Sequence, residues 1–414
     1  MTKPQKKQSA ATSDVSRRTF LIGAGATTGA FAAGASLGVA AASTAPTSGS
    51  LGLANGVVGS ATVPFYGSHQ AGIETPFQAH GTFLAFTVPN DFQRTAAVRM
   101  MTLLTDDAAR LTQGKPALGD NDEYLAYTPA RLTVTFGFGP GFFRKLGLQS
   151  QIPTGFANLP AFSIDKLDPA YSGGDLVIQV GTDDPLTLSH AVRQLTRTAR
   201  SFATITWSQS GFVRAAGSAP ATETPRNLFG QVDGTVNPRT SAEFETQVWA
   251  DGSPSWFDGG TQMVLRRIEM NLDTWDRLDD GGKEQAIGRR LSNGAPLTGE
   301  NEFDSPDLDA KTNTGLPVIP TFSHVRRSKT DNPEQKFLRR PLSYDEGIRA
   351  DGTSDVGLLF AAYMANISTQ YVPVQQRLSD LDLLNTWTTP VGSAVFAMPP
   401  GCQPGGYIGE GLLG

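Results

Sequence analysis

Residues 175–214 read DLVIQVGTDDPLTLSHAVRQLTRTARSFATITWSQSGFVR and contain the clearest secondary-structure signals of the chain. The first seven residues of this stretch form a short apolar run that is typical of a buried strand. Asp184 and Pro185 then predict a helix start, because aspartate is a favoured N-cap and proline is tolerated in the first helical turn. The alternation over residues 203–214 predicts a second strand. The stretch therefore gives strand, helix and strand in sequence.

The segments before this stretch complete a known order of elements. Residues 131–138 (RLTVTFGF) alternate like a strand, and residues 81–88 (GTFLAFTV) predict another. Between them, apolar residues recur at helical spacing over residues 91–113, with Asn90 as the expected N-cap. The order is then β-α-β-β-α-β, the split unit of a ferredoxin-like α+β domain.

The second half of the chain repeats this order more loosely. Strands are expected at residues 263–272, 337–344, 357–366 and 392–398, a broken helix at 274–290 and a helix at 369–384. We therefore expect two tandem ferredoxin-like domains with antiparallel sheets, residues 66–225 and 226–414. A single irregular α+β domain is the alternative, and periodicity alone leaves it open.

The N-terminus carries a pattern typical of protein export. Basic residues precede the motif SRRTFL at residues 16–21, and a Gly/Ala-rich apolar run follows to about residue 42. The paired arginines indicate a twin-arginine signal over residues 1–42, and the Ser/Gly-rich residues 43–65 predict a flexible linker. A membrane anchor is the alternative, but glycines weaken the apolar run as a span. We expect the twin-arginine machinery as a partner and a periplasmic or extracellular protein.

Charge and composition exclude several classes of protein and site. The 414 residues carry a net charge of −5; residues 1–42 hold five Lys or Arg and one Asp, so the remainder carries −9. Such an acidic protein is not expected to bind nucleic acid. The single cysteine, Cys402, permits neither an intramolecular disulfide nor a cysteine-based zinc site. Since the twin-arginine route exports folded proteins, often with a cofactor acquired inside the cell, a cofactor is expected.

Three motifs in the second half could carry chemistry. Residues 227–238 read NLFGQVDGTVNP, in which two glycines bracket Asp233 and could present its carboxylate on a sharp turn, although an ordinary Asp-Gly turn gives the same pattern. His324 in TFSHVRR is either a capping residue or a ligand, since a haem needs only one proximal imidazole. In FLRRPLSYD, strand alternation sends Arg339 and Arg340 to opposite faces, so one could point inward.

Taken in this order, the three motifs resemble the dye-decolorizing peroxidase family, haem enzymes built from two ferredoxin-like domains. The resemblance extends over about residues 67–400 and includes the exported, deferrochelatase-like branch of the family. Its supporting stretches are GSHQAGI (67–73), GGDL (173–176), DDP (183–185), WDR (275–277), IGR (287–289) and GAPL (294–297).

The resemblance implies haem b as the cofactor, His324 as the proximal iron ligand, and Asp233 and Arg339 on the distal side. The implied enzyme reduces hydrogen peroxide through a high-valent iron-oxo state and oxidises aromatic donors such as dyes and phenols. Asp233 would move a proton between the peroxide oxygens, and Arg339 would polarise the O–O bond. A carboxylate shuttle favours acidic pH. The alternatives are a haem-handling protein of iron acquisition and a haem-free binding protein.

The sequence alone leaves the partner of His324 and several other features open. Asp380, Asp382 or Asn385 could accept the second N–H of His324, and Asn385 fits the family's C-terminal pattern best. Pro341 would stiffen the backbone after Arg339 and could alter the channel to the haem. A homo-oligomer is also open. Structural hydrogen bonding is expected for the remaining histidines, and core packing or electron relay for the larger aromatic residues; these are His69, His80, His190, Trp207, Trp256, Trp275, Trp387 and Tyr344.

Overall fold

The computed structural model describes residues 58–414 except 221, 253 and 331. The predicted export signal and residues 43–57 lie outside the described residues. The last part of the predicted linker, residues 58–65, is packed rather than free: Ala61 O accepts a hydrogen bond from Arg131 N at 2.7 Å, and Phe65 is buried. In the part of the chain that the structure describes, no helix is long and apolar enough to span a membrane.

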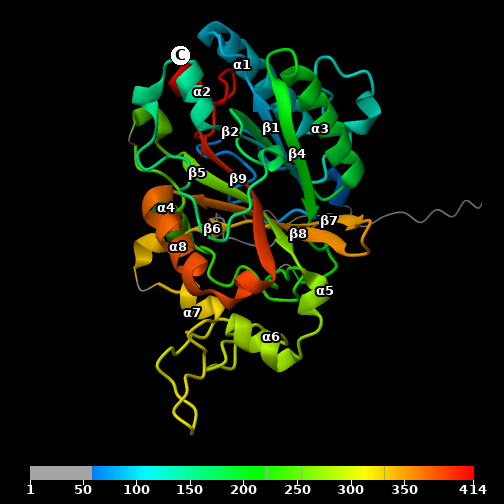
Figure 1. The fold of residues 1–414 in the computed structure, drawn as a ribbon. Coiled ribbons are helices and arrows are strands. Elements are labelled where there is room, and N and C mark those ends of the chain that lie inside the picture. Colours follow the sequence, from blue (N-terminus) through cyan, green and yellow to red (C-terminus); the bar gives the residue numbers. More distant parts are fainter. Residues whose placement is uncertain (1–57, 221, 253, 331) are drawn as a thin grey trace, which may run out of the picture. The chain divides into compact units, whose positions relative to one another are not determined.

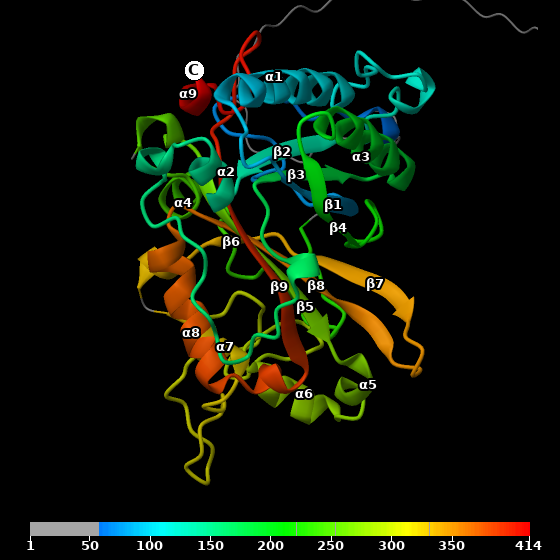
Figure 2. The same cartoon turned by 45° about the horizontal axis from the view of Figure 1, so that its top comes forward.

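The N-terminal half is an antiparallel sheet with two helices on one face (Figures 1 and 2). Its strands lie in the order β2-β3-β1-β4. The elements are β1 (His80–Thr87), α1 (Arg94–Leu111), β2 (Thr133–Phe138), α2 (Pro140–Lys145), β3 (Leu176–Thr182), α3 (Pro185–Ala199) and β4 (Thr204–Phe212). The predicted strands and the helices α1 and α3 are all present.

The two main helices of this half start in different ways. At α3, Asp184 caps as predicted, since its side chain accepts from Thr187 N at 2.7 Å. At α1, the predicted cap Asn90 is wrong. The helix begins only at Arg94, and its N-cap Gln93 makes no side-chain capping bond. Burial of its apolar face, including Met100 and Leu104, therefore positions α1 more than its cap does.

In the C-terminal half the strands lie in the order β9-β5-β8, and both β6 and β7 pair with the other edge of β8. If β6 and β7 count as one strand, each half has its fourth, first, third and second strands side by side in that order. Its elements are α4 (Ser241–Gln247), β5 (Thr261–Met270), α5 (Leu272–Trp275), α6 (Asp280–Ile287), α7 (His324–Ser328), β6 (Leu338–Arg339), β7 (Leu342–Ile348), β8 (Ser354–Met364), α8 (Val372–Leu381), β9 (Thr388–Met398) and α9 (Glu410–Leu413). The chain is therefore α+β with antiparallel sheets, as predicted.

Two predicted elements of this half are interrupted. The strand expected at 337–344 divides into β6 and β7 at Pro341, which has no N–H to donate to a neighbouring strand. The helix expected from residue 369 begins instead as a π-helical turn, Ile367–Tyr371, before α8. The break in the strand leaves the short β6 to position Arg339.

The two halves share one closed hydrogen-bonded sheet. β2 pairs with β9 at Phe138 and Ala397, and β4 pairs with β7 at Phe212 and Ser343. Since β5 also pairs with β8, the pairing closes on itself. The enclosed side chains form one apolar core, which includes Phe83, Trp207, Leu265, Tyr363 and Phe396. Asp233 lies in a loop and His324 in a short helix of the C-terminal half, whereas Arg339 lies in β6, whose Leu338 belongs to this core.

Candidate active site

The first motif forms a tight loop that presents Asp233. Gly230 and Gly234 adopt positive φ angles of 78° and 136°, which non-glycine residues rarely take, so both glycines are needed for the turn. Asp233 N donates to Pro225 O at 2.8 Å and holds the loop closed. The carboxylate Oδ1 accepts from Arg339 Nη1 at 2.9 Å, whereas the only contact of Oδ2 within the described residues is a long one with Asn227 Nδ2, at 3.4 Å. One oxygen of Asp233 is therefore firmly bound and the other is loosely bound.

Arg339 is held by its backbone as well as its side chain. Strand β6 pairs with β8 along one edge, Arg339 lying opposite Ala362. On the other edge, the side-chain amide of Asn237 donates to Arg339 O at 2.7 Å and accepts from Arg339 N at 3.0 Å. Asn237 thus takes the place of a neighbouring strand. The sequence reasoning gave it no role, and only its position four residues after Asp233 could have drawn attention to it.

His324 is the first residue of α7, and tight packing positions this end of the helix. Ser323, the residue before it, donates its hydroxyl to Pro320 O at 2.8 Å. Gly288, at the end of α6, lies so close that a Cβ there would come within 3.1–3.2 Å of Ile319, Ser323 and Val325. This close approach and a φ angle of 90° favour glycine at residue 288, the middle position of the IGR motif.

The hydrogen-bond partner of His324 is Asp382, not the favoured candidate Asn385. His324 Nδ1 lies 2.6 Å from Asp382 Oδ2, and only 3% of the Asp382 side chain is exposed. Asn385 instead donates to Leu378 O at 2.8 Å, and Asp380 accepts from Gln376 at 2.7 Å. Asp382 was one of three candidates, and the short distance identifies it.

The electrostatic surroundings connect His324 to the other two motifs. Burial lowers the pKa of His324, but the charge and hydrogen bond of Asp382 outweigh burial and the net shift of the pKa is upward. The charges of Arg339 and Asp233 also act on this pKa, in opposite directions. The three motifs, up to about one hundred residues apart in sequence, therefore lie in one electrostatic neighbourhood.

The donor set fits a haem better than a bare metal ion. Nδ1 of His324 is held by a buried carboxylate, and Nε2 has no hydrogen-bond partner among the described residues, while 30% of the side chain stays exposed. Haem iron takes this kind of single, oriented imidazole. Within residues 58–414, apart from the three masked positions, no group of three or more His, Cys, Asp or Glu could hold a metal ion.

A second arginine adds positive charge beside Arg339. Arg289 Nη1 donates to Gly294 O at 2.6 Å and to Glu302 O at 2.7 Å. Burial lowers the pKa of Arg289, the charge of Glu302 opposes this, and the nearby charge of Arg339 lowers it further. Two guanidinium groups near one another could donate hydrogen bonds to the carboxylates of a cofactor.

Arg340, His69 and His190 make hydrogen bonds that stabilise the fold. Arg340 points into the core, where it donates to Thr75 O and, at 2.9 Å, to Gln78 Oε1, and burial lowers its pKa to about 10. Arg339 and Arg340 thus face opposite ways, as alternation predicts. His69 and His190 are hydrogen-bonded, to Gly259 O at 2.7 Å and Asp120 at 2.8 Å, which confirms the structural interpretation.

Comparison with known proteins gives matches over both halves of the chain. Residues 70–213 match the family described as Dyp-type peroxidase, N-terminal, and residues 224–403 match Dyp-type peroxidase, C-terminal. A dye-decolorizing peroxidase of Thermobifida fusca is 39% identical over 332 residues, covering 78% of this chain and 77% of that protein. A deferrochelatase of Yersinia pseudotuberculosis is 33% identical and covers 84% of each.

Solved structures match in fold and sequence together. The DyP-type peroxidase from Cellulomonas bogoriensis has a TM-score of 0.84 and 47% identity, covering 86% of this chain and 99% of that one. Ferric DtpA from Streptomyces lividans has a TM-score of 0.83 and 40% identity, covering 86% and 98%.

Proposed function

Because the chain belongs to the DyP-type peroxidase family, and is therefore an oxidoreductase, we propose that it reduces hydrogen peroxide with haem b bound to His324 and oxidises aromatic donors such as dyes and phenols. One observation carries this proposal: the His324–Asp382 pair and the Asp233–Arg339 pair lie in one electrostatic neighbourhood. The ferric state of the similar Streptomyces protein supports an iron cofactor. The cofactor would lie in the C-terminal of two ferredoxin-like domains, divided near residue 225.

On the proximal side, His324 Nε2 would bind the iron and Asp382 would orient the ring. A haem with one imidazole ligand supplies redox-active iron with an open face for peroxide. The 2.6 Å contact to Asp382 fixes the proton on Nδ1 and makes the imidazole a stronger electron donor. Arg289 would pair with a carboxylate of the cofactor.

On the distal side, Asp233 acts as the proton carrier. Its Oδ1 is engaged by Arg339 at 2.9 Å, so the loosely bound Oδ2 is the atom that accepts a proton from one oxygen of hydrogen peroxide. The same atom returns this proton to the other oxygen, which leaves as water. No proton is gained or lost by Asp233 over the whole step.

Arg339 performs two tasks in this arrangement. Its ion pair orients the carboxylate of Asp233, and its remaining N–H groups stabilise the negative charge that develops on oxygen as the O–O bond breaks. Only 21% of its side chain is exposed, so water screens this charge weakly. Asn237 keeps the arginine backbone in register with the Asp233 loop.

Absorption and stopped-flow spectra test this proposal. The purified protein should show a strong Soret band that changes within milliseconds to seconds after hydrogen peroxide is added. His324→Ala should lose this band or its proximal coordination. Asp233→Asn should keep the band and slow the peroxide reaction by about 10²–10⁴-fold. Asp380→Asn, on an exposed carboxylate bonded to Gln376, is the matched control and should leave both unchanged. A variant of His324 with a native spectrum contradicts the ligand assignment.

Iron release from haem is the second candidate, because relatives 33% identical over most of this chain are named deferrochelatase. The higher identity to the peroxidases, 39% and 47%, favours the first. An assay of free iron and of intact porphyrin on one haem-loaded sample separates the two. A metal-free porphyrin product would favour the second candidate.

Residues 1–42 act in this proposal as a twin-arginine export signal, so the mature protein works in the periplasm or outside the cell. The basis is the SRRTFL motif with its apolar run. Replacing Arg17 and Arg18 with lysine should leave the protein in the cytoplasm. Export of this double variant at the normal rate contradicts the assignment.

A further inference from the structure

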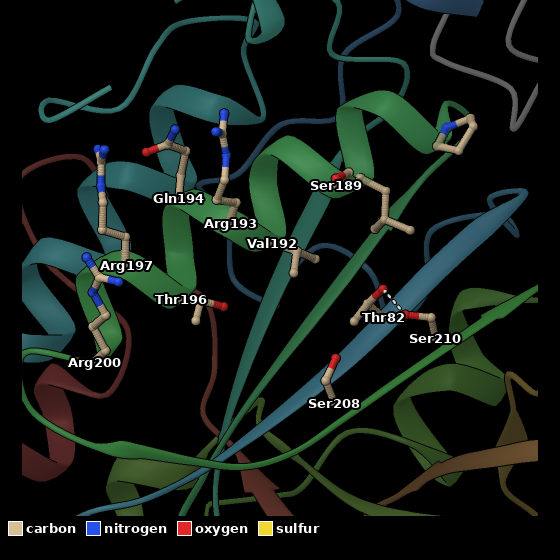
Figure 3. Close-up of a pocket in the computed structure, with 12 residues that line it drawn as sticks. Thr82, Ser189, Val192, Arg193, Gln194, Thr196, Arg197, Arg200, Ser208 and Ser210 are labelled. Carbon is tan, nitrogen blue, oxygen red and sulfur yellow. Dashed lines mark hydrogen bonds between the residues drawn. The ribbon is translucent and has the colours of Figure 1, made fainter. Parts of the chain in front are cut away.

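A polar groove lies between α3 and the outer face of the N-terminal sheet (Figure 3). Its volume is about 720 Å³, within the range of small-molecule sites. Its lining comes from α3, β1 and β4, and none comes from the segments that carry Asp233, His324 or Arg339. The lining residues are Thr82, Pro185, Leu188, Ser189, Val192, Arg193, Gln194, Thr196, Arg197, Arg200, Ser208 and Ser210.

The groove exists because α3 covers only part of the sheet. The helix packs mainly on β1 and β3, whereas β4 lies on the other side of β1. The outer side chains of β4 are consequently exposed, and they are hydroxyl-bearing: Thr206, Ser208 and Ser210 alternate with buried residues. The sheet therefore forms one polar wall of the groove, and α3 forms the other.

Several hydroxyl groups of this groove lack partners. Ser210 shares a hydrogen bond with Thr82, at 2.9 Å. The side chains of Ser208, Ser189 and Thr196 have no hydrogen-bond partner among the described residues. Figure 3 shows Thr196 and Val192 pointing from the helix toward the strands that carry Thr82, Ser208 and Ser210. A ligand in the groove would find donors and acceptors on both walls.

Two arginines of α3, Arg193 and Arg200, are among the residues that line the groove, and Figure 3 shows the Arg193 side chain pointing away from the strands. Arg193 and Arg200 are seven residues apart, which places both on one side of the helix. Arg200 makes no ion pair within the described part of the chain. Arg193 pairs with Asp122 at 2.8 Å, but both side chains are about half exposed, so the pair is weak and separable. These cations stand out on a chain with a net charge of −5.

The nearby acidic groups do not neutralise this face. Asp120 is buried and accepts hydrogen bonds from His190 and Gln194. Asp107 is buried and accepts from Thr198. The helix dipole also stabilises cations near the C-terminus of a helix, which accounts for the presence of Arg197 and Arg200 there. The dipole does not account for Arg193, nor for the unpartnered hydroxyl groups opposite.

We propose that this groove binds a small organic oxyanion. Its sulfonate, carboxylate or phosphate group pairs with Arg200, and with Arg193 after this side chain turns from Asp122 toward the strands, and accepts hydrogen bonds from the groove's hydroxyl groups. Its apolar body lies along Val192, Leu188 and Pro185. The site is separate from the peroxide chemistry and does not depend on the proposed function.

Calorimetric titration of the purified holoprotein with 2-naphthalenesulfonate tests the proposal. We expect saturable binding that weakens with added salt. The double variant R193Q/R200Q should bind at least tenfold more weakly, and Ser208→Trp, which fills the groove and leaves its charges, should also prevent binding. Arg99→Gln removes an exposed arginine from α1 outside the groove and should bind like the wild type.

Two further ligands test the anionic group and the apolar body of the ligand separately. Uncharged 2-naphthalenemethanol and inorganic sulfate should each bind far more weakly than the sulfonate, because each offers only half of the recognised chemistry. Sulfate binding as strong as that of 2-naphthalenesulfonate overturns the organic component. No saturable binding, or equal binding by R193Q/R200Q and the wild type, overturns the site itself.

Discussion

The side chain of Asn237 holds the backbone of Arg339 by both of its hydrogen-bonding groups, at 2.7 Å to the carbonyl and 3.0 Å to the N–H. The same loop supplies Asp233, which binds the guanidinium of Arg339 at 2.9 Å. One turn of chain therefore sets both the backbone and the side chain of the arginine. The position of Arg339 relative to Asp233 depends on Asn237 as much as on the ion pair.

Asn237→Ala should disturb the peroxide reaction more than the fold. It leaves two backbone groups of Arg339 without partners on this edge of β6, at a cost of about 1–3 kcal/mol in the free energy of unfolding. We expect a slower reaction with peroxide, by about tenfold or more, because a small misplacement of a catalytic group is costly. Stopped-flow spectroscopy and chemical denaturation measure the two effects.

A matched control separates positioning from general stability. Asn271 caps α5 by accepting from Thr274 N at 3.1 Å, far along the chain from the proposed catalytic loop. Asn271→Ala should lower stability by about 1 kcal/mol and leave the peroxide rate unchanged. Equal slowing in both variants would show that Asn237 has only a structural role.

The sequence was sufficient for the features that depend on local patterns. The strand order follows from short apolar runs, and the glycines around Asp233 do adopt the positive φ angles that the GQVDG motif requires. It was not sufficient for Asn237, because its partner lies 102 residues away and nothing local marks the contact. The role of an amide that binds backbone groups is visible only when both strands are in place.

The partner of His324 was beyond sequence reasoning for a similar reason. Asp380 lies in the last turn of α8, whereas Asp382 and Asn385 follow it, and which one faces the histidine depends on where the helix stops. It stops at Leu381, and Asp382 has an extended backbone. This turn directs the carboxylate of Asp382 inward, whereas Asp380 stays on the exposed surface of the helix.

Asp382→Asn should therefore weaken haem binding, and Asn385→Ala should not. Loss of the carboxylate makes the imidazole a poorer electron donor, so we expect haem affinity to fall by about 10- to 100-fold and the iron reduction potential to rise. Haem transfer to an apo-acceptor and spectroelectrochemistry measure these changes. If Asn385→Ala gave the same potential shift, the 2.6 Å contact would not be the one that tunes the iron.

Arg339→Leu and Arg340→Leu should fail in different ways. Arg339→Leu removes the charge beside Asp233 and should slow the peroxide reaction by about 10²–10³-fold with little loss of stability. Arg340→Leu leaves Gln78 Oε1 and Thr75 O unpaired in the core and should cost about 1–3 kcal/mol of stability. Thermal unfolding and peroxide kinetics on both variants make the comparison, and a catalytic defect of equal size in Arg340→Leu would exchange the two roles.

Cys402 should react with iodoacetamide unusually slowly in the native protein. It is buried and free, and burial together with the charge of Glu410 raises the pKa of its thiol to about 11. The thiolate is the reactive form, and with this pKa about one thiol in a thousand is ionised at pH 8, so alkylation is slow. Between pH 7 and 9.5 the alkylation rate should rise about tenfold per pH unit without levelling off. Because the chain has a single cysteine, mass spectrometry reports this site alone.

Protein unfolded in guanidinium is the control, and its alkylation rate should level off near pH 8.5. A native profile that also levels off near pH 8.5 would show that burial does not raise the pKa of this thiol.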